Sequence, residues 1–311
     1  MSGMTPSQAR VIDPILTTVA RGYKNAAFVG SLLFPYVPVP QRGGKIITFG
    51  KEDFKLYGTA RAPGANTKRV SYGYAGEAYA LEQHALEGVV PFEIMEEASA
   101  VPGIDMGKGA VTRTQNIIAL RLEYAQARLA TDATKYDAGN KSAPSGTDKW
   151  ENDASDPIAQ VEAAKEAVRA KIGRRPDAAV ISAAVWKSLK NHPKVIDRIK
   201  YTSRDNATPE LVAALFGLKK VAIGDAVYAD DKGKFTDVWG KSVVLGYVEV
   251  GSLAEMGTPA YGYTYQLMGY PMVEQPYPDR NAKSWIYPVT DEVRPVIAGA
   301  DAGFLIQNAV S

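Results

Sequence analysis

Residues 107–133 read GKGAVTRTQNIIALRLEYAQARLATDA, the longest helical pattern in the chain. Apolar side chains recur there at helical spacing, which places them on one stripe of an α-helix. The stripe comprises Val111, Ile118, Leu122, Ala125, Leu129 and Ala133. At about 1.5 Å per residue the helix would be roughly 40 Å long, more than a compact domain needs to close its core. We therefore expect a spine around which the other elements are arranged.

The other side of this predicted helix is charged. We expect it to be exposed, with most of its surface taken by Arg113, Arg121, Glu123 and Arg128. A charge placed on the apolar stripe, as in Leu122→Asp, would then prevent folding, whereas loss of an exposed arginine would leave the fold intact.

Length and composition limit the class of protein. A chain of 311 residues with 46% hydrophobic content can bury a sizeable core, and its length suggests about two domains. The formal net charge of +2 is too small to indicate a nucleic-acid-binding surface. The absence of cysteine excludes disulfides, thiolate metal sites and cysteine nucleophiles. No apolar run reaches the roughly 18 residues of a membrane span, and no cleavable signal is evident, so we expect a soluble protein.

Two segments of different character precede the helix. Residues 1–40 hold apolar groups between prolines and glycines, so we expect an arm that lies on a neighbouring surface; a disordered terminus is the alternative. Residues 41–90 contain two strand-like runs, GGKIITFG and KRVSYGYAGEAYALEQ, around a tip rich in Gly, Pro and Asn. A ribbon of this kind is marginally stable alone, so it lies against another surface or folds back on its own domain as an ordinary hairpin.

The chain after the helix alternates helices and strands. Residues 136–155 are polar and small, as in a connection between domains. Asp156 as N-cap, Pro157 in the first turn and Gly173 at the end predict a helix over 157–172. A buried strand is predicted at 177–182, and further elements up to residue 250 complete a mixed α/β part. The last sixty residues return to strands, with the runs SWIYPV, VRPVIA and GFLIQNAV.

No catalytic or binding motif is complete in this sequence. GIDMGKG, at residues 103–109, is one residue short of a phosphate loop between its glycines and lacks Ser or Thr after Lys108. No GxSxG motif is present, and neither His84 nor His192 has a partner pattern, so both are expected to be structural or surface residues. We therefore assign no catalytic, cofactor-binding or metal-binding residue, and we do not expect an enzyme.

Two acidic groups have a structural interpretation as well as a chemical one. Turn residues between strands are expected at Asp225, Asp230, Asp231 and Asp237, whose spacing does not match a calcium loop. Glu93, Glu96 and Glu97 could serve acid–base chemistry, but without a positioned partner they fit a solvated or intersubunit face better.

The order of these segments resembles the major capsid protein of tailed bacteriophages, whose Hong Kong ninety-seven type fold is shared with encapsulins. The pieces most similar to that family are DPILTTVARGYKNAAFVGSLLFPYVPV, from residue 13, and VVPFEIMEEAS, from residue 89. The similarity extends over nearly the whole chain, but no single piece is as specific as a metal-ligand signature.

The resemblance implies an α+β fold and a division of the chain. Residues 1–40 would be the N-terminal arm, 41–90 the E-loop, 91–140 the peripheral domain with the spine helix, 141–250 the axial domain and 251–311 the return to the peripheral sheet. About forty residues precede the loop, so we expect a separate scaffolding protein, or none, rather than removal of a fused one. Lys51, Lys55 and Lys68 lie in the loop, but no partner Asn or promoting Glu can be identified, so no crosslink is carried over.

The implied function is self-assembly. Identical chains would form hexamers and pentamers and close an icosahedral shell around double-stranded DNA, without sequence specificity. The resemblance also implies scaffold, portal and decoration proteins as partners, no cofactor, no membrane, and a place in the virion after assembly in the host bacterial cytoplasm.

Two alternatives remain open from sequence. An encapsulin-type compartment would enclose an enzyme instead of a genome, and a gene for such an enzyme nearby would favour it over the phage interpretation. An α/β enzyme with an unrecognised site is the other, and the presence of only two histidines and no cysteine weighs against it.

Overall fold

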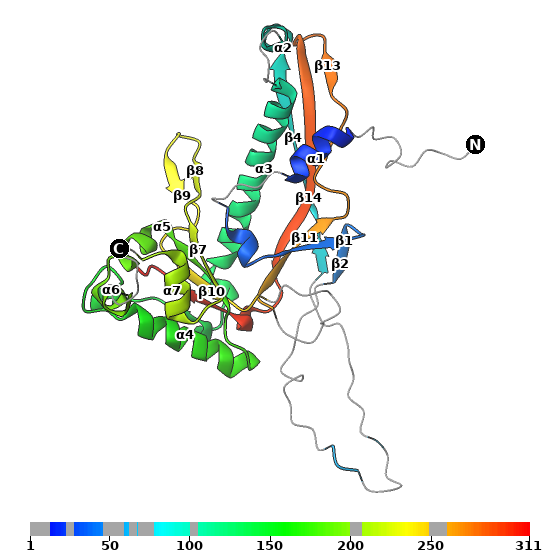
Figure 1. Cartoon of the computed structure of the whole chain (residues 1–311). Coiled ribbons are helices and arrows are strands. Elements are labelled where there is room, and N and C mark those ends of the chain that lie inside the picture. The colour runs from blue at the N-terminus through cyan, green and yellow to red at the C-terminus, as the bar shows by residue number, and fades with distance from the viewer. Residues whose placement is uncertain are drawn as a thin grey trace.

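The computed structural model describes residues 13–22, 28–45, 59–61, 67, 78–99, 105–199, 207–248 and 260–311. Within them the chain forms a long, narrow part on a six-stranded sheet and a compact part on a five-stranded sheet (Figure 1). Helices accompany both sheets, which is the α+β class expected from the sequence.

The six-stranded sheet is organised on its longest strand, β14 (Ser284–Ile297). One edge of β14 pairs antiparallel with β4 (Glu82–Pro91) along all ten residues of that strand. The other edge pairs in turn with β13 (Tyr277–Asp279), β12 (Met272–Val273) and β11 (Gly262–Leu267). A parallel strand, β1 (Tyr36–Val39), then adds to β11.

β14 is a single strand of 14 residues, where the sequence suggested the two runs SWIYPV and VRPVIA. Its prolines are tolerated because neither missing N–H faces a paired strand. Pro288 O accepts a hydrogen bond from Glu274 N at 3.1 Å, so the nitrogen of Pro288 faces the interruption between β12 and β13. Pro295 faces the other edge, where the ladder has already ended at the pair Val293–Glu82.

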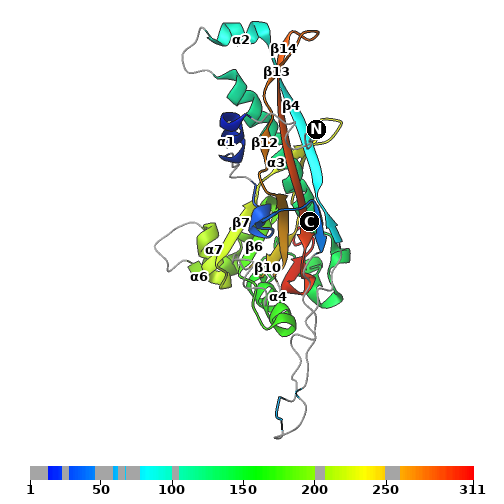
Figure 2. The ribbon, with the colours of Figure 1, turned by 90° about the vertical axis from the view of Figure 1, so that its right-hand side faces the viewer.

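The helix predicted for residues 107–133 is α3 (Met106–Ala130), which runs along the six-stranded sheet (Figures 1 and 2). Three residues of the predicted stripe, Val111, Ile118 and Leu122, are buried; Ala125, Leu129 and Ala133 are partly buried. Close approach of the helix requires Gly88 on β4, because a Cβ there would lie 3.1 Å from Ala110 O.

The five-stranded sheet runs in the order β5, β15, β10, β6, β7. Its strands are short: β5 (Lys141–Ser142), β6 (Ala178–Ser182), β7 (Lys220–Gly224), β10 (Val243–Gly246) and β15 (Gly303–Ile306). Every residue of β6, β10 and β15 is buried, as expected of continuous apolar runs in the middle of a sheet. The helices of this part are α4 (Pro157–Ile172), α5 (Ala183–Leu189), α6 (Pro193–Ile199) and α7 (Pro209–Phe216).

The sequence signals for α4 are confirmed at both ends. Asp156 accepts a hydrogen bond from Ala159 N at 3.0 Å, and Pro157 is the first helical residue. Gly173 ends the helix with a φ of 68°, a left-handed conformation that favours glycine. The segment before α4 is more than a connection, because Trp150 is fully buried and its Nε1 donates to Gln160 Oε1 at 2.8 Å.

Residues expected to form an arm on a neighbouring surface pack in part on their own chain. α1 (Pro14–Gly22) buries Leu16 and Ala20 in the cluster that includes residues of α3, β12 and β14. η1 (Gly30–Leu32) precedes Leu33 and Phe34, whose side chains are fully buried. These four side chains find cover within the chain, but Ile15 is 69% exposed and Tyr36 is 50% exposed, so part of the apolar surface of this segment stays open. Residues 1–12 and 23–27 lie outside the described residues.

The predicted loop, residues 41–90, lies largely outside the described residues, at 46–58, 62–66 and 68–77. Its described base is the antiparallel pair β2 (Gly43–Lys45) and β3 (Ala78–Ala80). Leu81 N donates to Arg42 O at 2.8 Å at the point where β3 passes into β4. After β4 the chain forms α2 (Phe92–Ser99), at the far end of the narrow part (Figures 1 and 2).

The end of the chain returns to the compact part. β15 pairs antiparallel with β10 and parallel with β5, so it is not part of the single sheet predicted for residues 251–311. A hairpin of β8 (Val227–Ala229) and β9 (Phe235–Asp237) extends from the compact part. The remaining short helices are η3 (Ala133–Lys135), η4 (Ala138–Asn140), η5 (Gly146–Asp148) and η6 (Ala300–Ala302). None of the helices in the described ranges has the length and apolar character needed to cross a bilayer.

Candidate functional site

The described residues contain no group of three or more His, Asp or Glu side chains placed to hold a metal ion. His192 is buried beside Ser155, with its Nε2 3.0 Å from Ser155 Oγ. Its Nδ1 accepts from Lys194 N at 3.2 Å, so the neutral ring carries its proton on Nε2 and donates toward Ser155 or Asn152. A histidine in this tautomer does not take a proton from the serine, and the pair instead holds the start of α6.

The other candidate motifs also have structural roles. Asp105 caps α3 by accepting from Lys108 N at 2.9 Å, so a carboxylate of the chain already occupies this helix end; residues 103 and 104 lie outside the described part. Asp230 Oδ1 accepts from Lys232 N and Lys234 N, both at 2.9 Å, which confirms a turn residue between β8 and β9. The remaining aspartates of that group, Asp225, Asp231 and Asp237, are exposed around the same hairpin.

Two further groups lie on the surface of the narrow part. Glu93, Glu96 and Glu97 are exposed on α2, at helical positions that share one face. His84, on β4, is partly buried with its Nε2 3.9 Å from Glu82. Burial, and then the nearby Arg121, lower the pKa of His84, so the ring is neutral at pH 7.

Glu123 of α3 is buried, and its predicted exposure is wrong. Its Oε2 accepts from Gly30 N at 2.8 Å, and its Oε1 accepts from Val29 N at 3.1 Å and from Trp239 Nε1 at 2.7 Å. Burial raises the pKa of this carboxyl, and the three hydrogen bonds oppose that rise. No sequence pattern indicates this contact, because the helical stripe describes only the face that packs on the sheet.

A second buried side chain of α3 extends this junction. Gln126 Nε2 donates to Thr264 Oγ1 at 2.8 Å, and that hydroxyl donates to Phe34 O at 3.0 Å. Together with Glu123, these bonds join the middle of α3 to residues 29–34, to β11 and to the compact part. The two parts of the chain are therefore connected through a satisfied polar network rather than by a flexible linker.

The base of the predicted loop is held by an ion pair with a buried carboxylate. Arg42 Nε lies 2.7 Å from Glu292 Oε2, and its Nη2 donates to Oε1 at 2.9 Å. The Glu292 side chain is 3% exposed and that of Arg42 is 67% exposed. Asp291, the preceding residue of β14, is also buried, and burial raises the pKa of its carboxyl to about 6.

An open cleft of about 630 Å³ lies between the second half of α3, the start of β4 and the end of β14. Its cationic lining comes from Arg121, Arg128 and Arg294. Arg294 pairs with Glu82, whereas Arg121 and Arg128 form no ion pair within the described part of the chain. Apolar side chains of α3, Leu122, Ala125 and Leu129, line the same cleft.

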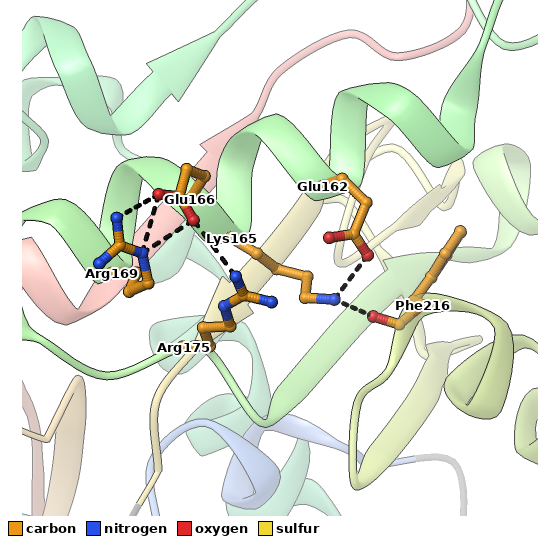
Figure 3. Close-up of polar contacts among 6 residues, drawn as sticks. All are labelled: Glu162, Lys165, Glu166, Arg169, Arg175 and Phe216. Carbon is orange, nitrogen blue, oxygen red and sulfur yellow. Dashed lines mark hydrogen bonds and ion pairs between the residues drawn. The ribbon is translucent and has the colours of Figure 1, made fainter.

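Lys165 is the buried cation of the compact part. Its Nζ lies 2.6 Å from Glu162 Oε1 and donates to the carbonyl oxygen of Phe216, the last residue of α7 (Figure 3). A cation at the carbonyl end of a helix is stabilising. Glu166 pairs with Arg169 and Arg175 on the exposed side of α4 (Figure 3). These charges connect helices of the fold and do not converge on a cavity.

Comparison with known proteins gives a consistent result. A family model described as phage major capsid protein E matches residues 125–288. The major capsid protein of Burkholderia phage BcepMu is 41% identical over 306 residues, which cover 97% of this chain and 98% of that protein. A phage-related protein from Bordetella bronchiseptica RB50 is 47% identical, with a TM-score of 0.82 over 97% of this chain and 98% of that structure.

More distant structures share the fold alone. The encapsulin complex of Synechococcus elongatus, at 13% identity, has a TM-score of 0.56 over 95% of each chain. The encapsulin thus shares the fold of this chain, but it is less similar than the Bordetella protein in both structure and sequence.

Proposed function

The chain belongs to the family of phage major capsid proteins, and from this premise we propose how its two parts build a shell. The protein is a structural component of a phage capsid, in the virion, and the observation that carries this conclusion is the 41% identity along almost the entire chain. We propose that it has no catalytic role. An encapsulin-type shell is the second candidate, supported only by likeness of fold.

We assign the compact part, with the five-stranded sheet, to contacts around the axis of each ring, and the narrow part, with α3 and β14, to contacts at the periphery. Within residues 41–90, the part between β2 and β3 is the segment that extends over the adjacent subunit, because β4 already pairs with β14 of its own chain. The pair Arg42–Glu292 supports this assignment, because it fixes the base of that segment to β14. Hexamers and pentamers then close an icosahedral shell through many interfaces of modest affinity.

The shell encloses double-stranded DNA without reading its sequence, which is consistent with a formal net charge of only +2. The shell assembles in the host bacterial cytoplasm, with a separate scaffolding protein if one is used. Portal or decoration proteins are its further partners.

Electron microscopy and light scattering of the purified chain test this function. We expect rings or closed particles of megadalton mass. A monomer that remains monomeric at high concentration and turns over a small substrate would contradict the proposal.

A deletion tests the loop assignment separately. Replacement of residues 51–69 by a short Gly/Ser turn should leave a soluble subunit with unchanged helical content, because α3 and both sheets keep their described contacts, but it should prevent closure of particles. Unfolding of the isolated variant would instead place this segment in the core of its own subunit.

A further inference from the structure

We propose that the cleft between α3, β4 and β14 receives α2 of a second copy of the chain. The acidic face of that helix would lie against Arg121 and Arg128. The inference rests on the proposed function, since it requires copies of the chain to assemble, and it names a contact by which they do so.

The cleft presents more positive charge than the chain itself neutralises. Glu82 is already paired with Arg294, and Asp132 accepts hydrogen bonds from Thr134 at the end of α3. Arg121 and Arg128 are exposed on the same side of α3, seven positions apart, which is about 10 Å along the helix. The cleft lining thus holds three arginines and two carboxylates, and Arg121 and Arg128 present an open cationic stretch of this length.

α2 has the complementary composition and size. Its eight residues span about 12 Å, and Glu93, Glu96 and Glu97 share its exposed face. Ile94 lies beside them and is 45% exposed. Glu93 and Glu97, next to this apolar side chain, match the two arginines next to Leu122, Ala125 and Leu129.

The partner is a second copy because a chain cannot reach its own cleft with α2. In Figures 1 and 2, α2 lies beyond the amino end of α3, at the far end of the narrow part. Arg121 lies fifteen residues after Met106, about 22 Å further along the helix axis. The contact joins two different surfaces of the chain, and heterologous contacts of this kind are the ones that propagate into rings.

Disulfide trapping tests the contact, and the absence of native cysteine makes the result unambiguous. We expect the double variant Glu97→Cys/Arg121→Cys to give a ladder of linked subunits on a non-reducing gel. The proposed contact would bring these two positions of neighbouring subunits close together, and a disulfide needs Cα atoms within about 7 Å. A control with the same α2 cysteine, Glu97→Cys/Lys187→Cys, carries its second thiol on an exposed residue of α5 and should remain mostly monomeric on the gel. Equal linkage in both variants, or none in either, would overturn the proposal.

Charge reversal gives an independent measure. Glu93→Lys/Glu97→Lys and Arg121→Glu/Arg128→Glu should each reduce the yield of particles by about tenfold or more, and the combination of all four should restore it. Circular dichroism of the unassembled variants checks that they are folded. Assembly unaffected by either reversal, or not restored in folded combined variants, would refute the contact. Normal assembly with less nucleic acid in the Arg121→Glu/Arg128→Glu particles would refute it as well, by identifying the cleft as a nucleic-acid site. Whether the wild-type chain forms particles reports separately on the proposed function.

Discussion

The two sheets of this chain differ in how completely they bury their strands. All residues of β6, β10 and β15 in the compact part are buried, whereas β4, at the edge of the six-stranded sheet, exposes Leu86 at 42% and Val89 at 57%. Exposed apolar groups on an edge strand form a surface that another chain commonly covers. The middle strands of the compact sheet are therefore covered by their own chain, and the outer edge of the six-stranded sheet leaves surface for neighbours.

The cores of the two parts also differ in polarity. The five strands of the compact sheet contain no acidic residue, while β14 buries two consecutive acidic residues, Asp291 and Glu292. Glu292 is paired with Arg42, whereas burial disfavours the charged form of Asp291, so this residue lowers the stability of the narrow part at neutral pH. The predictions below test this contrast in order of decreasing effect.

The same substitution should prevent folding in one sheet and reduce assembly in the other. Leu245 of β10 is fully buried, so Leu245→Asp should prevent folding, at a cost of more than about 4 kcal/mol. Leu86→Asp on β4 should cost the unassembled subunit about 1 kcal/mol or less and should mainly reduce particle yield. Soluble yield and denaturant unfolding measure both effects. Similar losses at the two positions would remove the distinction between the sheets.

The junction at Glu123 should be sensitive to a single methyl group. A Cβ on Gly30 would lie 2.9 Å from Glu123 Oε2 and would push residues 29–34 away from α3, so Gly30→Ala should lower the free energy of unfolding by about 2 kcal/mol. Gly109→Ala is the matched control, because no atom lies within 4 Å of its Cβ. It should stabilise α3 by about 0.5–1 kcal/mol. Tolerance of Gly30→Ala would mean that the two parts are not coupled through this network.

Stability of the narrow part should depend on pH through Asp291. Its pKa is about 6 in the folded chain against 3.8 for an ordinary aspartate, so the folded state binds the proton more tightly. Stability from this group is therefore present at low pH and declines as pH rises from about 4 to above 6. Asp291→Asn should match wild type near pH 4 and should be more stable by up to about 3 kcal/mol at pH 8, because Asn does not ionise. Unfolding curves that differ equally at both pH values would contradict this assignment.

Two exposed arginines should differ because their partners differ. Arg42 pairs with the buried Glu292, whereas Arg169 pairs with the exposed Glu166. Arg42→Ala should lower the Tm of the subunit measurably, since it removes the ion pair from a buried carboxylate, and Arg169→Ala should leave the Tm unchanged. Differential scanning calorimetry compares the two. Equal changes in Tm would show that the Glu292 carboxylate becomes hydrated when the Arg42 side chain is removed.

The sequence by itself determined the elements whose signals are local. The caps of α4, Asp156 and Gly173, and the apolar stripe of α3 act between residues one turn apart, so their physical effect is present in any fold the chain adopts. The absence of a recognisable catalytic motif and the order of the segments sufficed to indicate the family. The division into an arm, a loop at residues 41–90, a peripheral domain and an axial domain remains a prediction.

Only the tertiary structure decided which charged groups are buried and how the strands join. The donors to Glu123 lie 93 to 116 residues away in sequence, so no local pattern could show that this member of a charged helix face is buried. β14 is one strand despite two prolines because its neighbours happen to leave both nitrogens unpaired. β15 belongs to the five-stranded sheet and not to the six-stranded one, because it pairs with β10. In each case the deciding partner is distant in sequence, and only packing brings it into contact.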